Sequence, residues 1–130
     1  MLERTDATLI IRYNTDNEYF EGFTANFPIS AGTGDHFYCT LFRDLLLPIV
    51  RQFDPQLILV SAGFDGHRLD PMAETNLETE DYLWVTQLLT GLAKEYANDR
   101  LISTLEGGYH LNALAESVGV HVGELVRAGR

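Results

Sequence analysis

The feature that most constrains the fold is a nearly continuous apolar run, QLILVSAGF, at residues 56–64. Asp54 and Pro55 precede this run and Gly63 lies near its end, and all three residue types are typical of turns. A short, uninterrupted apolar run of this kind is typical of a parallel strand that is covered on both faces. The sequence therefore predicts a central strand of a parallel sheet at this position.

Strands and helices alternate along the rest of the chain. Further strands are predicted at ATLIIRY (7–13), TANFPIS (24–30) and LISTLEGG (101–108), with a turn or loop at NTDNEYFEG (14–22). Helices are predicted from Asp35 to about Gln52 with a bend at Pro48, from Thr79 to about Tyr96, and from Leu111 to Val126. Asp35 and Thr79 are expected to cap the first two helices. The alternation predicts an α/β fold: an open, mostly parallel sheet with flanking helices and right-handed crossovers.

Composition limits the class of protein and its partners. A length of 130 residues without an interdomain linker indicates a single domain, 1–130. Nine Lys and Arg against nineteen Asp and Glu give a net charge of −10, which disfavours nucleic acid and anionic membranes as partners. The lone Cys39 excludes an internal disulfide. No segment has the length and apolar character of a membrane span or a secretory signal, so a cytoplasmic location is expected.

One candidate site is SAGFDGHRLDP, residues 61–71, where the predicted central strand ends. Ligands bind open parallel sheets at the carboxyl ends of their strands. Asp65 and His67 have side chains that zinc accepts, although a catalytic zinc needs three protein ligands. Asp65 and Asp70 could instead be loop carboxylates that accept from backbone N–H groups, and His67 a hydrogen-bonded loop histidine.

A second candidate site is LEGGYHL, residues 105–111, which follows another predicted strand. Gly107 and Gly108 permit a close approach of the backbone, and the hydroxyl of Tyr109 could donate to a developing oxyanion. The alternative is that Tyr109 packs at the start of the last helix. His36, His110 and His121 are expected to have surface, neighbouring or packing roles.

Four segments together resemble consecutive blocks of the histone deacetylase and acetoin-utilisation superfamily, in its bacterial, class II-like branch. They are ANFPISAGTGD, LLLPIVRQFDPQLILVSAGFDGHRLDP, LETEDY and LEGGYHLNALAESV, and the resemblance extends from about residue 22 to the C-terminus. It implies a partial fold of the arginase and deacetylase type. It also implies zinc-dependent hydrolysis of an amide, typically an acetyl group on lysine or a polyamine.

The resemblance assigns roles to particular residues. Asp65 matches the family's second aspartate zinc ligand, whereas His67 is a metal candidate only from its side-chain chemistry. Tyr109 matches the tyrosine that polarises the acyl carbonyl and stabilises the oxyanion. Gly107, Gly108, Asp70 and Pro71 match positions of the substrate channel and its backbone wall.

The chain also departs from the family pattern. The family uses a tandem histidine pair as general base and acid, and an Asp-x-His pair that supplies two more zinc ligands, both N-terminal to the first block. This chain has four histidines but no His-His pair, and its Asp65-Gly66-His67 lies in the later aspartate block. We therefore expect the C-terminal half of a deacetylase domain, with an incomplete zinc site and no useful activity alone.

Several partners are compatible with a truncated domain of this kind. Its exposed apolar surface predicts a homo-oligomer or a complex with a complementary N-terminal deacetylase half. The main alternative function is a non-catalytic oligomeric binding or assembly module on a degenerate deacetylase scaffold. An unrelated doubly wound α/β binding protein would be favoured if Asp65 and Tyr109 lay at opposite ends of the sheet.

Overall fold

The computed structural model of the chain describes residues 10–14 and 24–130. The chain forms two compact units, residues 1–30 and 31–130. In the first unit, β1 (Ile10–Asn14) and β2 (Thr24–Pro28) pair in parallel, with Ile10 opposite Thr24. Both predicted strands are confirmed, although the second ends at Pro28 and not at Ser30. Residues 7–9 of the first predicted strand and residues 15–22 of the predicted loop lie outside the described residues.

The second unit begins with a helical segment in three parts: α1 (Asp35–Leu41), the π-helical turn η1 (Phe42–Leu46) and α2 (Leu47–Phe53). Proline has no N–H with which to continue the α-helical hydrogen bonds. A π-helical turn, the short form in which this rare helix type mostly occurs, ends two residues before Pro48, and the predicted bend at Pro48 itself stays a prediction. The predicted N-cap of α1 is displaced by one residue, because Gly34 is the N-cap and Asp35 is the first helical residue.

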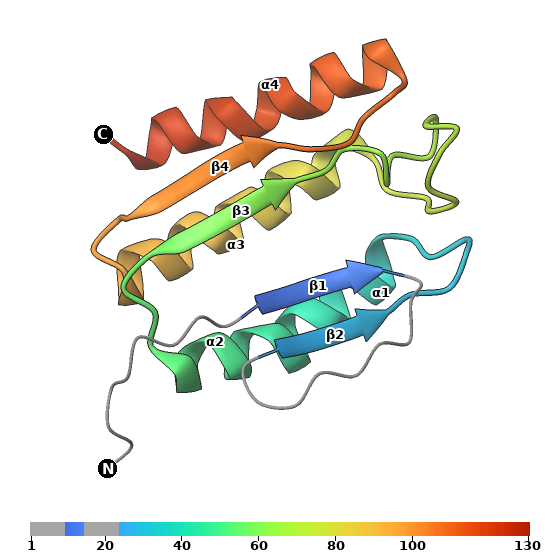
Figure 1. The fold of residues 1–130 in the computed structure, drawn as a ribbon. Coiled ribbons are helices and arrows are strands. Elements are labelled where there is room, and N and C mark those ends of the chain that lie inside the picture. Colours follow the sequence, from blue (N-terminus) through green and yellow to red (C-terminus); the bar gives the residue numbers. More distant parts are fainter. Residues whose placement is uncertain (1–9, 15–23) are drawn as a thin grey trace. The chain divides into compact units, whose positions relative to one another are not determined.

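A strand–helix–strand–helix unit follows, and it contains both candidate sites. Its elements are β3 (Ile58–Ala62), α3 (Thr79–Tyr96), β4 (Leu101–Leu105) and α4 (Leu111–Ala128). β3 and β4 pair in parallel, and α3 packs against α4 (Figure 1). The structure is therefore the predicted α/β fold with a parallel sheet and flanking helices. None of the described helices combines the length and apolar character that crossing a membrane requires.

The predicted cap of α3 is also displaced by one residue. Glu78 is the N-cap, and Thr79 is the first residue of the helix. The Glu78 side chain accepts from the backbone of Asp81, and Asp81 Oδ2 accepts from the Glu78 N–H at 2.8 Å. This reciprocal pair satisfies two backbone donors at the start of the helix, which a lone threonine hydroxyl cannot do.

The core of the second unit lies between the helices and one face of the β3–β4 pair. Phe42 of η1 meets Trp84 of α3 edge to face, with ring centroids 5.7 Å apart. Burial of a large apolar side chain of this kind contributes roughly 1.5–3 kcal/mol. The buried apolar residues are Leu41, Phe42, Leu46, Val50, Phe64, Leu77, Leu92, Ala93, Ala97 and Ala113.

The other face of the β3–β4 pair is exposed, and here the expectation of two covered faces is wrong. Leu59 of β3 is 69% exposed, and its partner Ile102 in β4 is 58% exposed. Successive side chains of a strand point to opposite faces. Ser103 faces α4, where it meets His121, so Leu59 and Ile102 lie on the face away from that helix.

Candidate functional site

The candidate site lies where β3 and β4 end, at the same edge of their sheet. The segments that follow the two strands emerge side by side because the strands are parallel (Figure 1). Two backbone hydrogen bonds join these segments: Glu106 N–H to Ala62 C=O at 3.0 Å and Phe64 N–H to Gly107 C=O at 2.8 Å. Asp65 and Tyr109 therefore lie at the same end of the sheet, and the condition that would favour an unrelated binding protein is not met.

Asp65 is half-buried and lies against the backbone of two glycines. A Cβ atom added at Gly107 would lie 2.7 Å from the Asp65 Cγ, and one added at Gly63 would lie 2.9 Å from its Oδ1. Both distances are shorter than real Cβ contacts, so the carboxylate occupies space that any other residue type would fill. The two glycines thus permit the Asp65 carboxylate to lie where the two strands end.

Two tyrosines from different helices lie near enough to this carboxylate for its charge to affect them. Burial and then the charge of Asp65 raise the pKa of Tyr38 in α1 to about 12, although a hydrogen bond with Thr75 opposes the shift. The same two causes, in the same order, raise the pKa of Tyr82 in α3. The Tyr82 hydroxyl donates to the Phe64 C=O at 3.2 Å. Both phenols are neutral near pH 7, so neither adds a charge near Asp65.

His67 is 3% exposed, and its contacts are with its own loop and the start of α3. Its Nδ1 accepts from the Leu69 N–H at 3.2 Å, and its Nε2 lies 3.5 Å from the Thr79 Oγ1. Its ring stacks on Tyr82 with an interplanar angle of 5°. These are the contacts of a hydrogen-bonded loop histidine.

A zinc site needs more ligands than the described residues bring together. Within residues 10–14 and 24–130, no three His, Cys, Asp or Glu side chains are close enough together to hold a metal ion. Catalytic zinc needs three protein ligands and an open position. The described part of the chain therefore does not form a complete zinc site, and Asp65 offers at most one ligand.

Asp70 joins the loop after β3 to the turn before α4. Its Oδ2 accepts from the backbone N–H groups of Tyr109 at 2.6 Å and His110 at 3.0 Å. Its Oδ1 accepts from the Met72 N–H at 3.0 Å, across the exposed Pro71. Burial alone would raise the pKa of Asp70, but these three donors outweigh burial and lower it.

Tyr109 is 58% exposed and lies between a constrained glycine and a helix cap. Gly108 has a φ of +140°, and a Cβ there would lie 2.6 Å from the Leu114 Cδ1, so only glycine fits. On the other side, the His110 Nδ1 accepts from the Ala113 N–H at 3.3 Å and caps α4. The turn therefore places an exposed tyrosine at the strand edge that also holds Asp65.

Some of these features are not evident from sequence patterns. The link from Asp70 to Tyr109 spans 39 residues, and the Asp-Pro pair signals only a turn. The places of Tyr38 and Tyr82 near Asp65 depend on how α1 and α3 pack. Tyr82 ends the LETEDY segment of the family resemblance, whereas Tyr38 lies between two of the four segments.

The profile of the histone deacetylase domain matches residues 12–125 of this chain. The chain belongs to the histone deacetylase domain family. The match begins at Arg12 within β1 and ends at Leu125 within α4. It therefore starts upstream of residue 22, from which the sequence resemblance was expected to extend.

Curated relatives agree with this assignment. Over 81% of the chain, it is 45% identical to the human polyamine deacetylase HDAC10, of which it spans 15%. Over 75% of the chain, it is 42% identical to the chloroplastic histone deacetylase 14 of Arabidopsis thaliana, of which it spans 23%. Over 68% of the chain, it is 37% identical to a probable deacetylase of Archaeoglobus fulgidus, of which it spans 25%. The chain thus spans no more than a quarter of each of these proteins.

Solved deacetylase structures share its fold. The HD domain of HDA15 superposes with a TM-score of 0.77 at 26% identity, over 91% of this chain and 37% of that one. The histone deacetylase Clr3 superposes with a TM-score of 0.73 at 31% identity, over 81% of this chain and 17% of that one. The α/β fold and the family are therefore shown by sequence and by structure.

Proposed function

We propose that this chain is the C-terminal portion of a class II-like, bacterial-type deacetylase domain that hydrolyses acetyl-lysine or an acetylated polyamine. The observation that carries the proposal is the position of Asp65 and Tyr109 at one strand edge, with Gly107 against the Asp65 carboxylate. Relatives named as polyamine and histone deacetylases support both substrate classes.

The roles proposed for this chain are those that its own residues can perform. The Tyr109 hydroxyl donates a hydrogen bond to the acyl oxygen of the substrate, and this bond strengthens as negative charge develops there. Asp65 provides one carboxylate ligand to a metal site that other residues must complete. Gly107, Gly108 and Pro71 form the backbone wall beside the acyl group. Zinc is the cofactor that we propose for the completed site.

Activity on this proposal requires residues beyond these 130. The 130 residues contain no His-His pair and no Asp-x-His besides the one at Asp65, so a second copy of this chain cannot supply the missing groups. A complementary N-terminal deacetylase half could supply them. We therefore propose that the isolated chain is inactive, that a homo-oligomer covers its apolar surface, and that it acts in the cytoplasm.

A non-catalytic assembly module is the second candidate function. It is favoured by the exposed apolar pair Leu59 and Ile102 and by the lack of a three-ligand cluster in the described residues. On this reading the scaffold is retained for association, and zinc has no role.

A deacetylation assay separates the two candidates. The substrates are an acetyl-lysine peptide and an acetylated polyamine, tested with zinc, and with or without a separately expressed N-terminal half of a related deacetylase domain. We expect turnover only with the added half, a loss of that turnover in Asp65→Ala, and a decrease of roughly a hundredfold or more in Tyr109→Phe.

The matched control is Asp44→Ala, because Asp44 is an exposed carboxylate paired with Arg43 in η1. This variant should keep the full activity of the complemented protein. Turnover by the chain alone that is lost in Asp65→Ala would contradict the proposed inactivity. A stable oligomer without zinc binding or turnover under any condition would support the assembly module.

A further inference from the structure

We infer that Asp70 is a positioning residue for Tyr109: its carboxylate fixes the turn that carries the tyrosine and so sets where the hydroxyl lies. This inference rests on the proposed role of the Tyr109 hydroxyl as a donor to the substrate. Asp70 itself acts through the backbone of the turn and not on the reacting atoms.

The hydrogen bonds of Asp70 link two segments that are distant in sequence. One carboxylate oxygen accepts from two successive backbone N–H groups, those of Tyr109 at 2.6 Å and His110 at 3.0 Å. The other oxygen accepts from the Met72 N–H at 3.0 Å, which holds the carboxylate in its own loop. Hydrogen bonds to an ionised acceptor are about twice as strong as neutral ones.

The turn needs such a restraint because of the residues that precede Tyr109. Gly107 and Gly108 come directly before it, and glycine has the largest backbone freedom of any residue. Without Asp70, the first fixed point after the two glycines would be the cap that His110 makes with Ala113. A catalytic donor has to be held within about 0.5 Å of its productive position, and fixed amides at Tyr109 and His110 provide that precision.

Protonation of Asp70 removes acceptor capacity from the carboxylate. The titratable groups that face Asp70 are His110, whose charge favours the ionised carboxylate, and Tyr82 of α3, whose pKa the Asp70 charge helps to raise. The turn should therefore be fixed at neutral pH and loosen in acid, as Asp70 binds a proton.

Amide hydrogen exchange, measured by NMR on the full chain, tests the inference without any need for turnover. In Asp70→Ala we expect exchange at the Tyr109 and His110 amides to become at least tenfold faster. The Ala97 amide, which bonds to the Ala93 C=O in α3, should be unchanged. Asp70→Asn keeps one acceptor oxygen and should fall between Asp70→Ala and the unmodified chain. Asp44→Ala should match the unmodified chain.

A second measurement keeps the inference testable if Asp70→Ala does not fold. In the unmodified chain, the amide shifts of Tyr109 and His110 should follow the carboxyl carbon shift of Asp70 as the pH is lowered. Unchanged exchange in a folded Asp70→Ala chain, or amide shifts that do not follow Asp70, would overturn the inference.

Kinetics of the complemented protein show whether the restraint matters for chemistry. Asp70→Ala should lower kcat at least tenfold with Tyr109 present and have little further effect in a Tyr109→Phe background, because both changes act through one hydroxyl. An equal loss in both backgrounds would overturn the inference. If the complemented, unmodified protein shows no turnover, the proposed function fails, and the exchange experiment still decides whether Asp70 fixes the turn.

Discussion

At the residue scale, the Asp65 carboxylate and the Gly107 backbone lie so close together that no side chain fits at position 107. The Asp65 carboxylate lies where a side chain on Gly107 would lie, since a Cβ there would be 2.7 Å from the Asp65 Cγ. Gly107 therefore has to be a glycine for reasons of space, and the orientation of Asp65 depends on it.

Replacement of Gly107 by alanine should destabilise the protein. The added methyl group forces Asp65 or the backbone after β4 to move, and overpacking of this kind costs about 1–3 kcal/mol. The matched control is Gly123→Ala in α4, where nothing lies within 4 Å of the new Cβ. That control should stabilise the helix by about 0.5–1 kcal/mol. Urea unfolding of the two variants measures both effects, and equal stabilities would contradict the proposed contact.

The sequence predicted some of these residues and missed others for a physical reason. Asp65 and Tyr109 each follow a strand, and parallel strands end at the same edge, so their proximity follows from topology alone. The contacts of Asp70 and His67 depend on the path of an irregular loop, which no periodic pattern encodes. His110 was expected to be only a neighbour of the site, whereas its ring caps α4.

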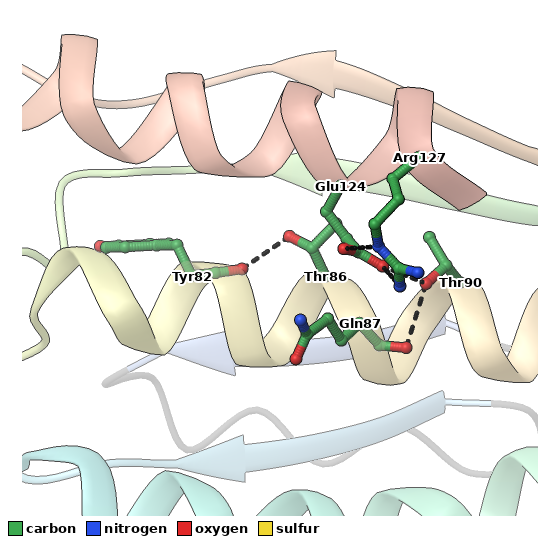
Figure 2. A network of polar contacts seen from close by, with 6 residues as sticks. All are labelled: Tyr82, Thr86, Gln87, Thr90, Glu124 and Arg127. Atoms are coloured by element: carbon green, nitrogen blue, oxygen red, sulfur yellow. Dashed lines mark hydrogen bonds and ion pairs between the residues drawn. The ribbon is translucent and has the colours of Figure 1, made fainter. Parts of the chain in front are cut away.

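At the element scale, α3, α4 and β4 meet around polar groups as well as apolar ones. The Thr86 hydroxyl of α3 donates to the Tyr82 C=O at 2.6 Å (Figure 2). The same hydroxyl lies 2.8 Å from the His121 Nδ1. The Ser103 Oγ of β4 lies 2.9 Å from the His121 Nε2. The His121 ring of α4 thus bridges a helix and a strand, and this is the packing role expected from the sequence.

A second polar contact lies further along the same two helices. Arg127 and Glu124 of α4 form two hydrogen bonds at 2.7 and 2.5 Å, and Thr90 of α3 donates to Glu124 at 3.5 Å (Figure 2). A carboxylate on the inner side of α4 is thereby paired with a charge and a hydroxyl, as a group withdrawn from water requires.

The His121 contacts predict how stability depends on pH. Burial lowers the pKa of His121 in the folded protein, so the unfolded chain binds a proton first as the pH falls. The stability that buried, neutral His121 contributes is complete above about pH 6.5. It is lost progressively as the pH falls from there to the lowered pKa of His121. His121→Gln should be less stable at pH 7.5 but should lose less stability between pH 7.5 and 5.5 than the unmodified chain.

Urea unfolding at the two pH values measures this difference, and His36→Gln is the control because His36 is exposed. The control should show the same pH dependence as the unmodified chain. If His121→Gln also shows that dependence, then His121 is not the group responsible.

The boundaries of the helices and strands show which features of the fold the sequence patterns can predict. Apolar periodicity located α3 and α4 to within a few residues, because their buried faces recur every three or four positions. The caps were each displaced by one residue, since backbone geometry at Gly34 and Glu78 decides the cap. The apolar run of β3 indicated two covered faces, but an apolar sequence cannot specify what covers it.

At the scale of the whole molecule, the exposed side of the β3–β4 pair is the surface on which the proposed association would occur. Leu59 and Ile102 are opposite one another in the strand register, so they form one apolar surface and not two scattered positions. Contiguous apolar surface of this kind is typical of interaction sites. The solved HDA15 domain superposes over only 37% of its own length, so the deacetylase fold includes elements that this chain lacks.

Charged substitutions on this face should disrupt the self-association that we propose. A fully buried leucine contributes roughly 1.5–3 kcal/mol, so Leu59→Lys or Ile102→Lys should weaken association by about tenfold or more. Light scattering over a concentration series measures the effect. The matched control is Leu111→Lys, because Leu111 is 78% exposed but lies in the first turn of α4, away from that face. The control should associate as the unmodified chain does.

The three possible outcomes distinguish the partners. Weaker association in the two strand variants alone would identify this face as the contact between copies. Equal weakening in all three variants would indicate nonspecific association of a charged chain. A monomer at every concentration would contradict self-association. A complementary N-terminal deacetylase half would then be the proposed partner, because it could supply both the histidines that these 130 residues do not contain and a cover for Leu59 and Ile102.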